Sequence, residues 1–182
     1  MADASSLPLF TFFATVRKHN AESFAKRFPE PMLLYLATVA TSSDSKHATT
    51  HRMVVAELEK KRGTEASKAG LEQRVAAVKK TPRNPIASQI SIGRGDDNDI
   101  VVEEPTVSKQ HAFFEQRGRL WTLSDLDSAN GTFVSGRQLS PDDTSPLTDE
   151  TVIALGSCEM RFLLPMSFHA HVLNVLQMSE FS

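Results

Sequence analysis

Residues 90–114 read ISIGRGDDNDIVVEEPTVSKQHAFF, and this stretch sets the pattern for the rest of the fold. Its apolar and β-branched residues fall in short runs at 90–92, 100–102 and 112–114, and a segment rich in Gly, Asp and Asn separates the first two runs. Short runs bounded by turn residues are typical of β-strands. The stretch therefore predicts strands joined by polar loops.

The same pattern continues on both sides of this stretch. Further short apolar runs occupy residues 75–78, 120–123, 132–134, 152–155 and 158–164. In the last run every second residue from Cys158 to Leu164 is apolar, which is the alternation of a strand with one buried face. Gly136 and Gly156 lie where tight turns would join neighbouring strands. Several short strands separated by turn signals predict a β-sandwich or a β-barrel.

Residues 1–72 differ in texture and are expected to form an N-terminal extension of mixed helix, strand and loop. The apolar stretch 7–16 follows a start without Lys or Arg, so it indicates folded structure and not an export signal. Residues 20–28 predict a short helix that stops before Pro29. Residues 32–40 are apolar and fit either a buried strand or a short helix.

The C-terminal residues 166–182 change to a helical period. Apolar side chains recur there with the spacing i, i+4, i+7 and i+8, at Phe168, Val172, Val175 and Leu176. We expect an amphipathic helix that covers an apolar patch of the β domain, with partner binding as the alternative. The predicted organisation is thus an N-terminal extension (1–72), a β domain (73–165) and a C-terminal helix.

Composition excludes several classes of function. The 182 residues carry a formal net charge of −2, so no overall positive field would attract nucleic acid or an anionic membrane. No apolar run approaches the ~20 residues that span a bilayer. Cys158 is the only cysteine, which argues against a disulfide or a Cys-based zinc site and favours a reducing, cytoplasmic setting. We expect no metal, no other cofactor, and neither nucleic acid nor membrane as a partner.

The predicted loops carry polar blocks in a recognisable order. Gly-Arg lies at 93–94, PTVSKQH at 105–111 and DLDSANGT at 125–132. The order Gly-Arg, Ser-x-x-His and Asn-Gly-Thr, each between short strands, resembles the forkhead-associated (FHA) family over roughly residues 73–165. The resemblance implies a mainly β fold, an eleven-stranded β-sandwich, here with short N-terminal and C-terminal helices. It also implies that loops at one end of the sandwich hold a peptide that contains phosphothreonine.

Phosphothreonine carries a charge of about −1.5 to −2 at pH 7 and three strong acceptor oxygens. Arg94 offers a planar fork for two of these oxygens, and Ser108 offers a hydroxyl and a backbone N–H. Lys109 adds a mobile positive charge, while Asn130 can donate to and accept from the peptide main chain. In the family, the matching residues fill these roles. The expected partner is therefore a threonine-phosphorylated protein or peptide, in Ser/Thr kinase signalling.

Other residues of the motifs are expected to shape the loops. The resemblance assigns this role to Gly93, His111, Gly131 and Thr132. Gly131 would supply a backbone angle that other residues resist, and His111 would satisfy backbone groups of the loops. No residue is expected to be catalytic.

Ala129 departs from the family pattern. FHA domains often have Ser or Thr just before Asn-Gly-Thr, where the hydroxyl donates to the phosphate, and the neighbouring Ser128 need not point the same way. One hydrogen bond to a charged group is worth about 1.5–3 kcal/mol, so its loss would weaken binding tenfold or more. The alternative function is therefore a structural FHA domain that mediates assembly without phosphate.

Further alternatives are weaker. Arg94 could be an ordinary ion-pair partner of Asp96 or Asp99. An enzyme with its active site in residues 1–72 has no nucleophile–base pair, metal spacing or phosphate loop in its favour. Self-association is also conceivable, driven by phosphorylation of Thr41, Thr49 or Thr50 in a polar, Ser/Thr-rich segment.

Overall fold

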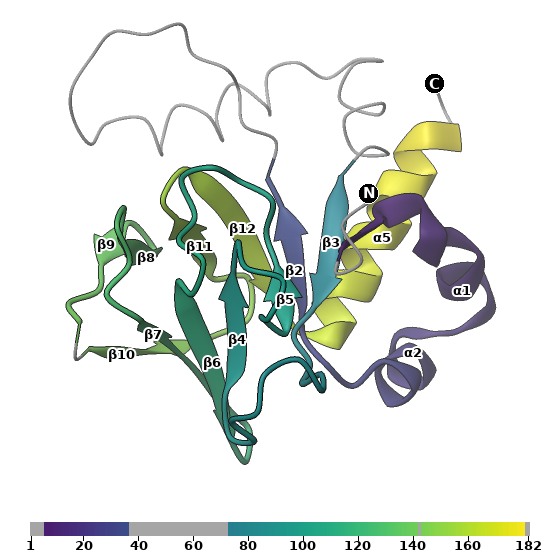
Figure 1. Ribbon diagram of the computed structural model, residues 1–182. Helices are drawn as coiled ribbons and strands as arrows, with labels where there is room; N and C mark the ends of the chain where they lie inside the picture. The colour runs from purple at the N-terminus through teal and green to yellow at the C-terminus, as the bar shows by residue number, and fades with distance from the viewer. Residues whose placement is uncertain (1–5, 37–72, 142, 181–182) are drawn as a thin grey trace, which may run out of the picture.

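The computed structural model describes residues 6–36, 73–141 and 143–180, and it shows two β-sheets packed face to face with helices on one side (Figure 1). The first sheet has seven strands in the order β1-β3-β2-β12-β11-β8-β9. These are β1 (Ser6–Pro8), β2 (Met32–Tyr35), β3 (Arg74–Ala77), β8 (Thr132–Val134), β9 (Arg137–Gln138), β11 (Val152–Leu155) and β12 (Cys158–Leu163). The sandwich predicted from the sequence is therefore confirmed.

The second sheet has five strands in the order β10-β7-β6-β4-β5. These are β4 (Ile90–Gly93), β5 (Ile100–Val101), β6 (Ala112–Arg117), β7 (Leu120–Asp125) and β10 (Thr144–Leu147). The pairing of β4 with β5 is parallel, with Ile92 opposite Ile100 and Gly93 opposite Val101. The carboxyl ends of these two strands consequently lie at the same edge of the sheet.

Apolar side chains from both sheets fill the space between them. Phe162 on β12 lies with its ring centroid 6.0 Å from that of Trp121 on β7 and 6.4 Å from that of Phe114 on β6. Met160 on the same face of β12 is also fully buried. The alternation read in this strand thus places its apolar face between the sheets, as predicted.

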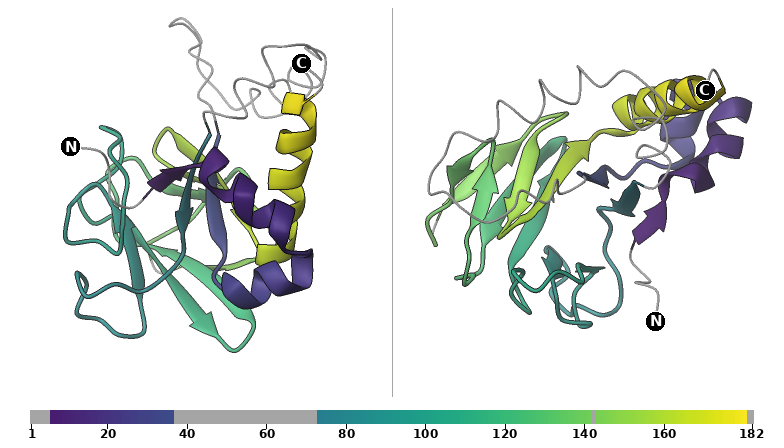
Figure 2. Two further views of the ribbon diagram at one scale, coloured as in Figure 1. Left: turned by 90° about the vertical axis from the view of Figure 1, so that its right-hand side faces the viewer. Right: turned by 90° about the horizontal axis from the view of Figure 1, so that it is seen from above.

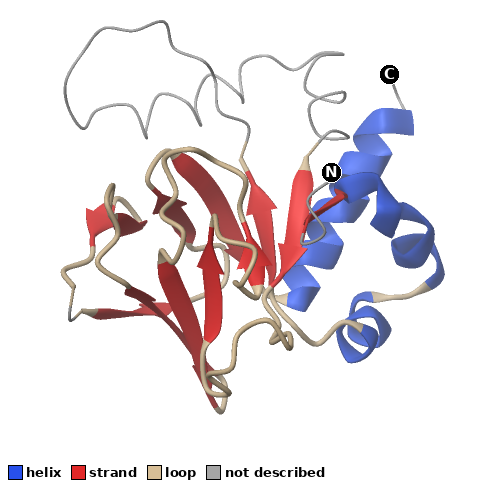
Figure 3. Cartoon of the chain, viewed as in Figure 1, coloured by secondary structure: helices blue, strands red, loops and turns tan. Residues whose placement is uncertain are grey.

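Helices pack on the outer face of the seven-stranded sheet over β2, β3 and β12 (Figure 2). They are η1 (Leu9–Phe12, a 3-10 helix), α1 (Phe13–Lys18), α2 (Ala21–Arg27) and α5 (Pro165–Glu180). Figure 3 shows them gathered on one side of the strands. None of the helices in the described ranges combines the length and the apolar character that a membrane span requires.

A second apolar core lies between the helices and the sheet. Phe168 on α5 is fully buried, and its ring centroid lies 5.1 Å from Phe12 and 6.1 Å from Phe24. The other residues of the predicted stripe are buried in the same cluster: Val172, Val175 and Leu176. The expected amphipathic helix is therefore present and packs on the β domain together with the N-terminal helices.

Strand β2 shows why residues 32–40 could not be classified from periodicity. Leu33 points into the core between the sheets, whereas Met32 and Leu34 point into the core under the helices. A strand with both faces buried has no polar alternation, so its sequence does not distinguish it from a helix segment.

The N-terminal residues contribute to the sandwich itself. Strand β2 lies between β3 and β12, and β1 adds an edge strand by pairing with β3. The described residues consequently contain twelve strands instead of the expected eleven, because this short edge strand joins the sheet. The boundaries at residues 72 and 165 stay a prediction, and residues 41–50, with Thr41, Thr49 and Thr50, lie outside the described residues.

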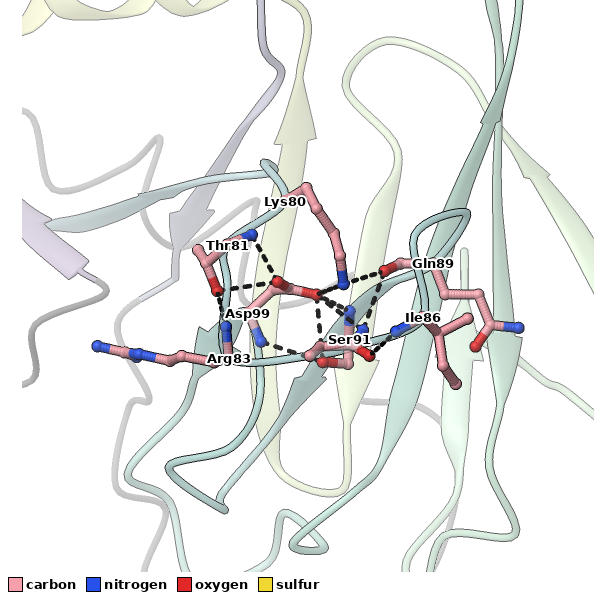
Figure 4. A network of polar contacts seen from close by, with 8 residues as sticks. Lys80, Thr81, Arg83, Ile86, Gln89, Ser91 and Asp99 are labelled. Carbon is pink, nitrogen blue, oxygen red and sulfur yellow. Dashed lines mark hydrogen bonds and ion pairs between the residues drawn. The ribbon is translucent and has the colours of Figure 1, made fainter.

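A buried carboxylate ties the segment before β4 to the start of β5 (Figure 4). The side chain of Asp99 is fully buried and accepts hydrogen bonds from several groups, namely Lys80 Nζ, Thr81 N and Oγ1, Asn84 Nδ2, and Ser91 N and Oγ. Burial alone would raise the pKa of Asp99, but the bonds from Ser91, Thr81, Asn84 and Lys80 lower it overall. Asp99 therefore stays ionised and fixes the loop that leads into β4.

Candidate functional site

The loops that carry the predicted ligand-binding residues meet at one end of the sandwich. They follow β4, join β5 to β6, and join β7 to β8. Arg94 N donates to Ser108 O (2.8 Å), and Ala129 N donates to Ser108 Oγ (3.0 Å). Asn130 Nδ2 donates to Thr106 O (2.7 Å). The structure thus brings the three loops together around Ser108.

Arg94 is exposed, and its guanidinium is held by one protein contact. Its Nε donates to Val107 O at 3.1 Å, and within the described ranges no carboxylate forms an ion pair with it. Asp99, one of its candidate partners, is instead committed to Lys80 and its neighbours. The terminal nitrogens of Arg94 therefore remain as donors for an anion, which argues against the ion-pair alternative.

Ser108 and its neighbours offer further donors beside Arg94. Because Ser108 Oγ accepts from Ala129 N, its own hydroxyl hydrogen can donate to a ligand. Lys109 is exposed, and its backbone oxygen accepts from Gly95 N at 2.9 Å. Asn130 is also exposed and uses its amide nitrogen for Thr106, so its Oδ1 is the atom that can accept from a peptide N–H.

His111 is fully buried beneath these loops. Ser108 N donates to its Nδ1 at 2.9 Å, so Nδ1 carries no hydrogen and Nε2 donates to Gly131 O at 3.2 Å. Burial lowers the pKa of His111, although Gly131 O and the charge of Asp125 act in the opposite direction. The neutral ring joins two of the ligand-binding loops, and this geometry supports a loop-structuring role.

We expect the stability of the protein to fall between pH 7.5 and pH 5, in part because of His111. The pKa of His111 is lowered in the folded state. Its contribution to stability is therefore complete above the unfolded-state pKa of about 6.5, and it is lost as the pH falls through the folded-state pKa. One proton accounts for a slope of at most about 1.4 kcal/mol per pH unit. Urea unfolding of wild type and of His111→Asn between pH 7.5 and pH 5 measures this slope of stability with pH.

The variant should lose part of that slope, because Asn can accept from Ser108 N but does not titrate. His171 has a lowered pKa for reasons of burial and the nearby charge of Arg161, so it leaves a residual slope of the same sign. An identical slope in wild type and His111→Asn would show that His111 is not responsible.

Asp125 is a site residue that the sequence reading missed. Its carboxylate accepts from Thr132 Oγ1 (2.5 Å), Ser128 Oγ (2.6 Å) and Ser128 N (2.9 Å). Burial would raise the pKa of Asp125, but these bonds lower it overall. Ser128 is consequently turned toward Asp125, so it does not replace the hydroxyl that Ala129 lacks. The only sequence signal was the position of Asp125 in the DLDSANGT block.

A close backbone contact explains Gly93, and a left-handed backbone conformation explains Gly131. A Cβ on Gly93 would lie 2.3 Å from Lys109 O, so a side chain there would push the loops apart. Gly131 has φ +79°, in the left-handed region that favours glycine, and a Cβ there would lie 2.5 Å from Gln138 Nε2. Asn98, also missed from the sequence, bridges the same loops by donating to Gly95 O (2.8 Å) and Lys109 O (2.6 Å).

A β-sandwich that gathers unpaired donors on loops at one end belongs to the class of ligand-binding modules, since the loops of such folds commonly carry function. Residues 90–156 match the sequence model of the FHA domain. Residues 90–156 therefore belong to the FHA domain family.

Relatives of known name match the same region. The chain is 35% identical over 71 residues to an oxoglutarate dehydrogenase inhibitor of Corynebacterium jeikeium, which covers 39% of this chain and 47% of the relative. It is 34% identical over 73 residues to the glycogen accumulation regulator GarA of Mycolicibacterium smegmatis, with 40% and 44% covered. The match thus spans less than half the length of each of these relatives.

Solved structures of FHA proteins are also similar. The chain shares 32% identity with Mycobacterium tuberculosis EmbR in complex with a low-affinity phosphopeptide, with 43% of this chain and 20% of that one covered and a TM-score of 0.40. It shares 30% identity with the FHA domain of an Arabidopsis thaliana protein, with 42% and 67% covered and a TM-score of 0.40.

Proposed function

We propose that the chain is a phosphothreonine-dependent protein–protein interaction module in Ser/Thr kinase signalling. The observation that carries the proposal is the exposed guanidinium of Arg94, which pairs with no carboxylate of the described residues and whose Nε donates to Val107 O, the residue before Ser108. A charged fork next to a short hydroxyl donor suits a phosphoryl group with its acceptor oxygens. Lys109 and the Oδ1 atom of Asn130 would complete the contact with phosphate and peptide main chain.

A screen against an oriented phosphothreonine peptide library tests this proposal. The best peptide is then measured by titration calorimetry in phosphothreonine, phosphoserine and unphosphorylated forms, with inorganic phosphate as a further control. We expect binding that requires the phosphorylated threonine. Equal affinity for the unphosphorylated peptide would overturn the proposal.

The proposed role is binding without catalysis, in the cytoplasm. The family membership supports it, as do the inhibitor and regulator names of the curated relatives. His111, which could be taken for a general base next to Ser108, accepts from the backbone N–H of Ser108 and not from its hydroxyl. An activity screen on the purified chain would test the point.

Assembly without phosphate is the second candidate, and Ala129 is the observation that favours it. Its backbone N–H is bonded to Ser108 Oγ, and no hydroxyl projects from this position. The apolar terminal segments favour this candidate less, because Phe12 and Phe168 are buried in the molecule's own second core. Phosphatase treatment of a native complex distinguishes the two functions, since an unchanged complex would support phospho-independent assembly.

Replacing Ala129 by Ser should tighten phosphopeptide binding. Position 129 is exposed and its backbone already contacts Ser108, so a hydroxyl there would lie beside the donors proposed for the phosphate. A hydrogen bond to a charged group is worth about 1.5–3 kcal/mol, so we expect roughly tenfold or greater tightening by calorimetry. Ala129→Val, without a hydroxyl, is the control and should bring no gain.

A further inference from the structure

Arg94 and Glu103 lie side by side because β4 and β5 are parallel. Gly93 ends β4 and is opposite Val101 in β5, and Val102 N donates to Gly93 O at 2.9 Å. The residues that follow Gly93 and Val102 in the sequence are Arg94 and Glu103. Both line one open hollow on the surface, together with Pro105 among the described residues.

The carboxylate of Glu103 is exposed and, within the described ranges, has no cationic partner. The neighbouring acidic residues, unlike Glu103, make contacts with other described side chains. Glu104 is near Ser157 Oγ (3.5 Å), and Asp97 accepts from Gln110 Nε2 (3.2 Å). Among the described residues, the hollow therefore presents the guanidinium of Arg94 and the carboxylate of Glu103 near each other without an ion pair between them.

A phosphate bound by Arg94 would also be repelled by the carboxylate of Glu103. A positive side chain of the peptide beside the phosphate would be attracted to Glu103, and this attraction would offset the repulsion. We propose that Glu103 makes the site selective for phosphothreonine peptides that carry a Lys or Arg next to the phosphothreonine, on the one side that Glu103 faces. This inference rests on the proposed function.

A charge scan of the ligand tests it. A neutral peptide with a central phosphothreonine is made with a single Lys, Ala or Glu at each of the flanking positions. Fluorescence anisotropy measures the affinities for wild type, Glu103→Gln and Glu103→Lys, at low and at physiological salt. Exposed ion pairs contribute about 0.2–1 kcal/mol, so we expect Lys to tighten binding about 1.5- to fivefold over Ala at adjoining positions on one side only.

In Glu103→Gln the preference for Lys should disappear, and in Glu103→Lys the same positions should prefer Glu. Glu22→Lys, in helix α2, changes the net charge by the same amount as Glu103→Lys. It should leave the preference for Lys in the peptide as it is in wild type. A preference that survives in Glu103→Gln, lies equally on both sides, or is lost in Asp96→Asn instead would overturn the inference while leaving phosphothreonine binding intact. Failure of every phosphopeptide to bind would overturn the proposed function, and this inference with it.

Discussion

Arg94→Ala should weaken binding of a cognate phosphothreonine peptide by about 30-fold or more. Loss of a buried or bidentate charge-assisted contact costs roughly 2–5 kcal/mol, which corresponds to a factor of about 30 to several thousand. The fold should not change, because Arg94 is exposed and its side chain makes only one described bond, to Val107 O. Calorimetry gives the affinity, and thermal unfolding of the same sample verifies the fold.

Two further variants sharpen this result. Arg94→Lys keeps the charge and removes the planar fork, so its affinity should fall between those of wild type and Arg94→Ala. Arg117 lies at the other end of β6 and pairs with Glu115, so Arg117→Ala should bind like wild type. An Arg94→Ala protein that binds as tightly as wild type would refute the assignment of the site.

Asp99→Ala should lower the free energy of unfolding by about 3–5 kcal/mol, the usual cost of removing one member of a buried charged pair. The variant leaves Lys80 without its carboxylate and takes away the acceptor of the donors of Thr81, Asn84 and Ser91, of which Asn84 is buried. Urea unfolding at pH 7 measures the change, with Asp96→Ala as the control. Asp96 lies in the same loop but is exposed, so its loss should cost less than about 0.5 kcal/mol.

Asp99→Asn keeps the shape of the side chain but exchanges acceptors for an amide donor, so it should be destabilised as well. It provides a measurement should Asp99→Ala not fold. If both variants lost less than about 1 kcal/mol, the network around Asp99 would not hold the loop before β4 as the structure implies.

Local patterns in the sequence were sufficient for the elements that expose one face. In β12, Met160 and Phe162 alternate with charged residues, and in α5 the stripe from Phe168 to Leu176 has helical spacing. The helix predicted over residues 20–28 is α2 (Ala21–Arg27), and Asn20 precedes it with a side chain that accepts from Ser23 N. Each of these signals depends on neighbours within a few residues.

The sequence indicated which loops carry the candidate site, but it did not indicate the hydrogen bonds between them. The motif order pointed to Arg94, Ser108 and Asn130, whose loops do meet. That Asp125 anchors Thr132, and that Asn130 spends its amide nitrogen on Thr106, follows from contacts between separate loops. Polar side chains have several possible partners, and only the packed loops select among them.

By itself the sequence determined the short β-strands, the amphipathic C-terminal helix and the order of the loop motifs, because these depend on local periodicity and residue type. The choice of a β-sandwich over a β-barrel came from the resemblance of the motifs to the FHA family. Only the tertiary structure decided that β2 inserts between β3 and β12, that the terminal segments build a shared second core, and that Glu103 lies beside Arg94. The physical reason is that strand pairing and burial on two faces gain their free energy from residues far apart in the chain, which no local pattern records.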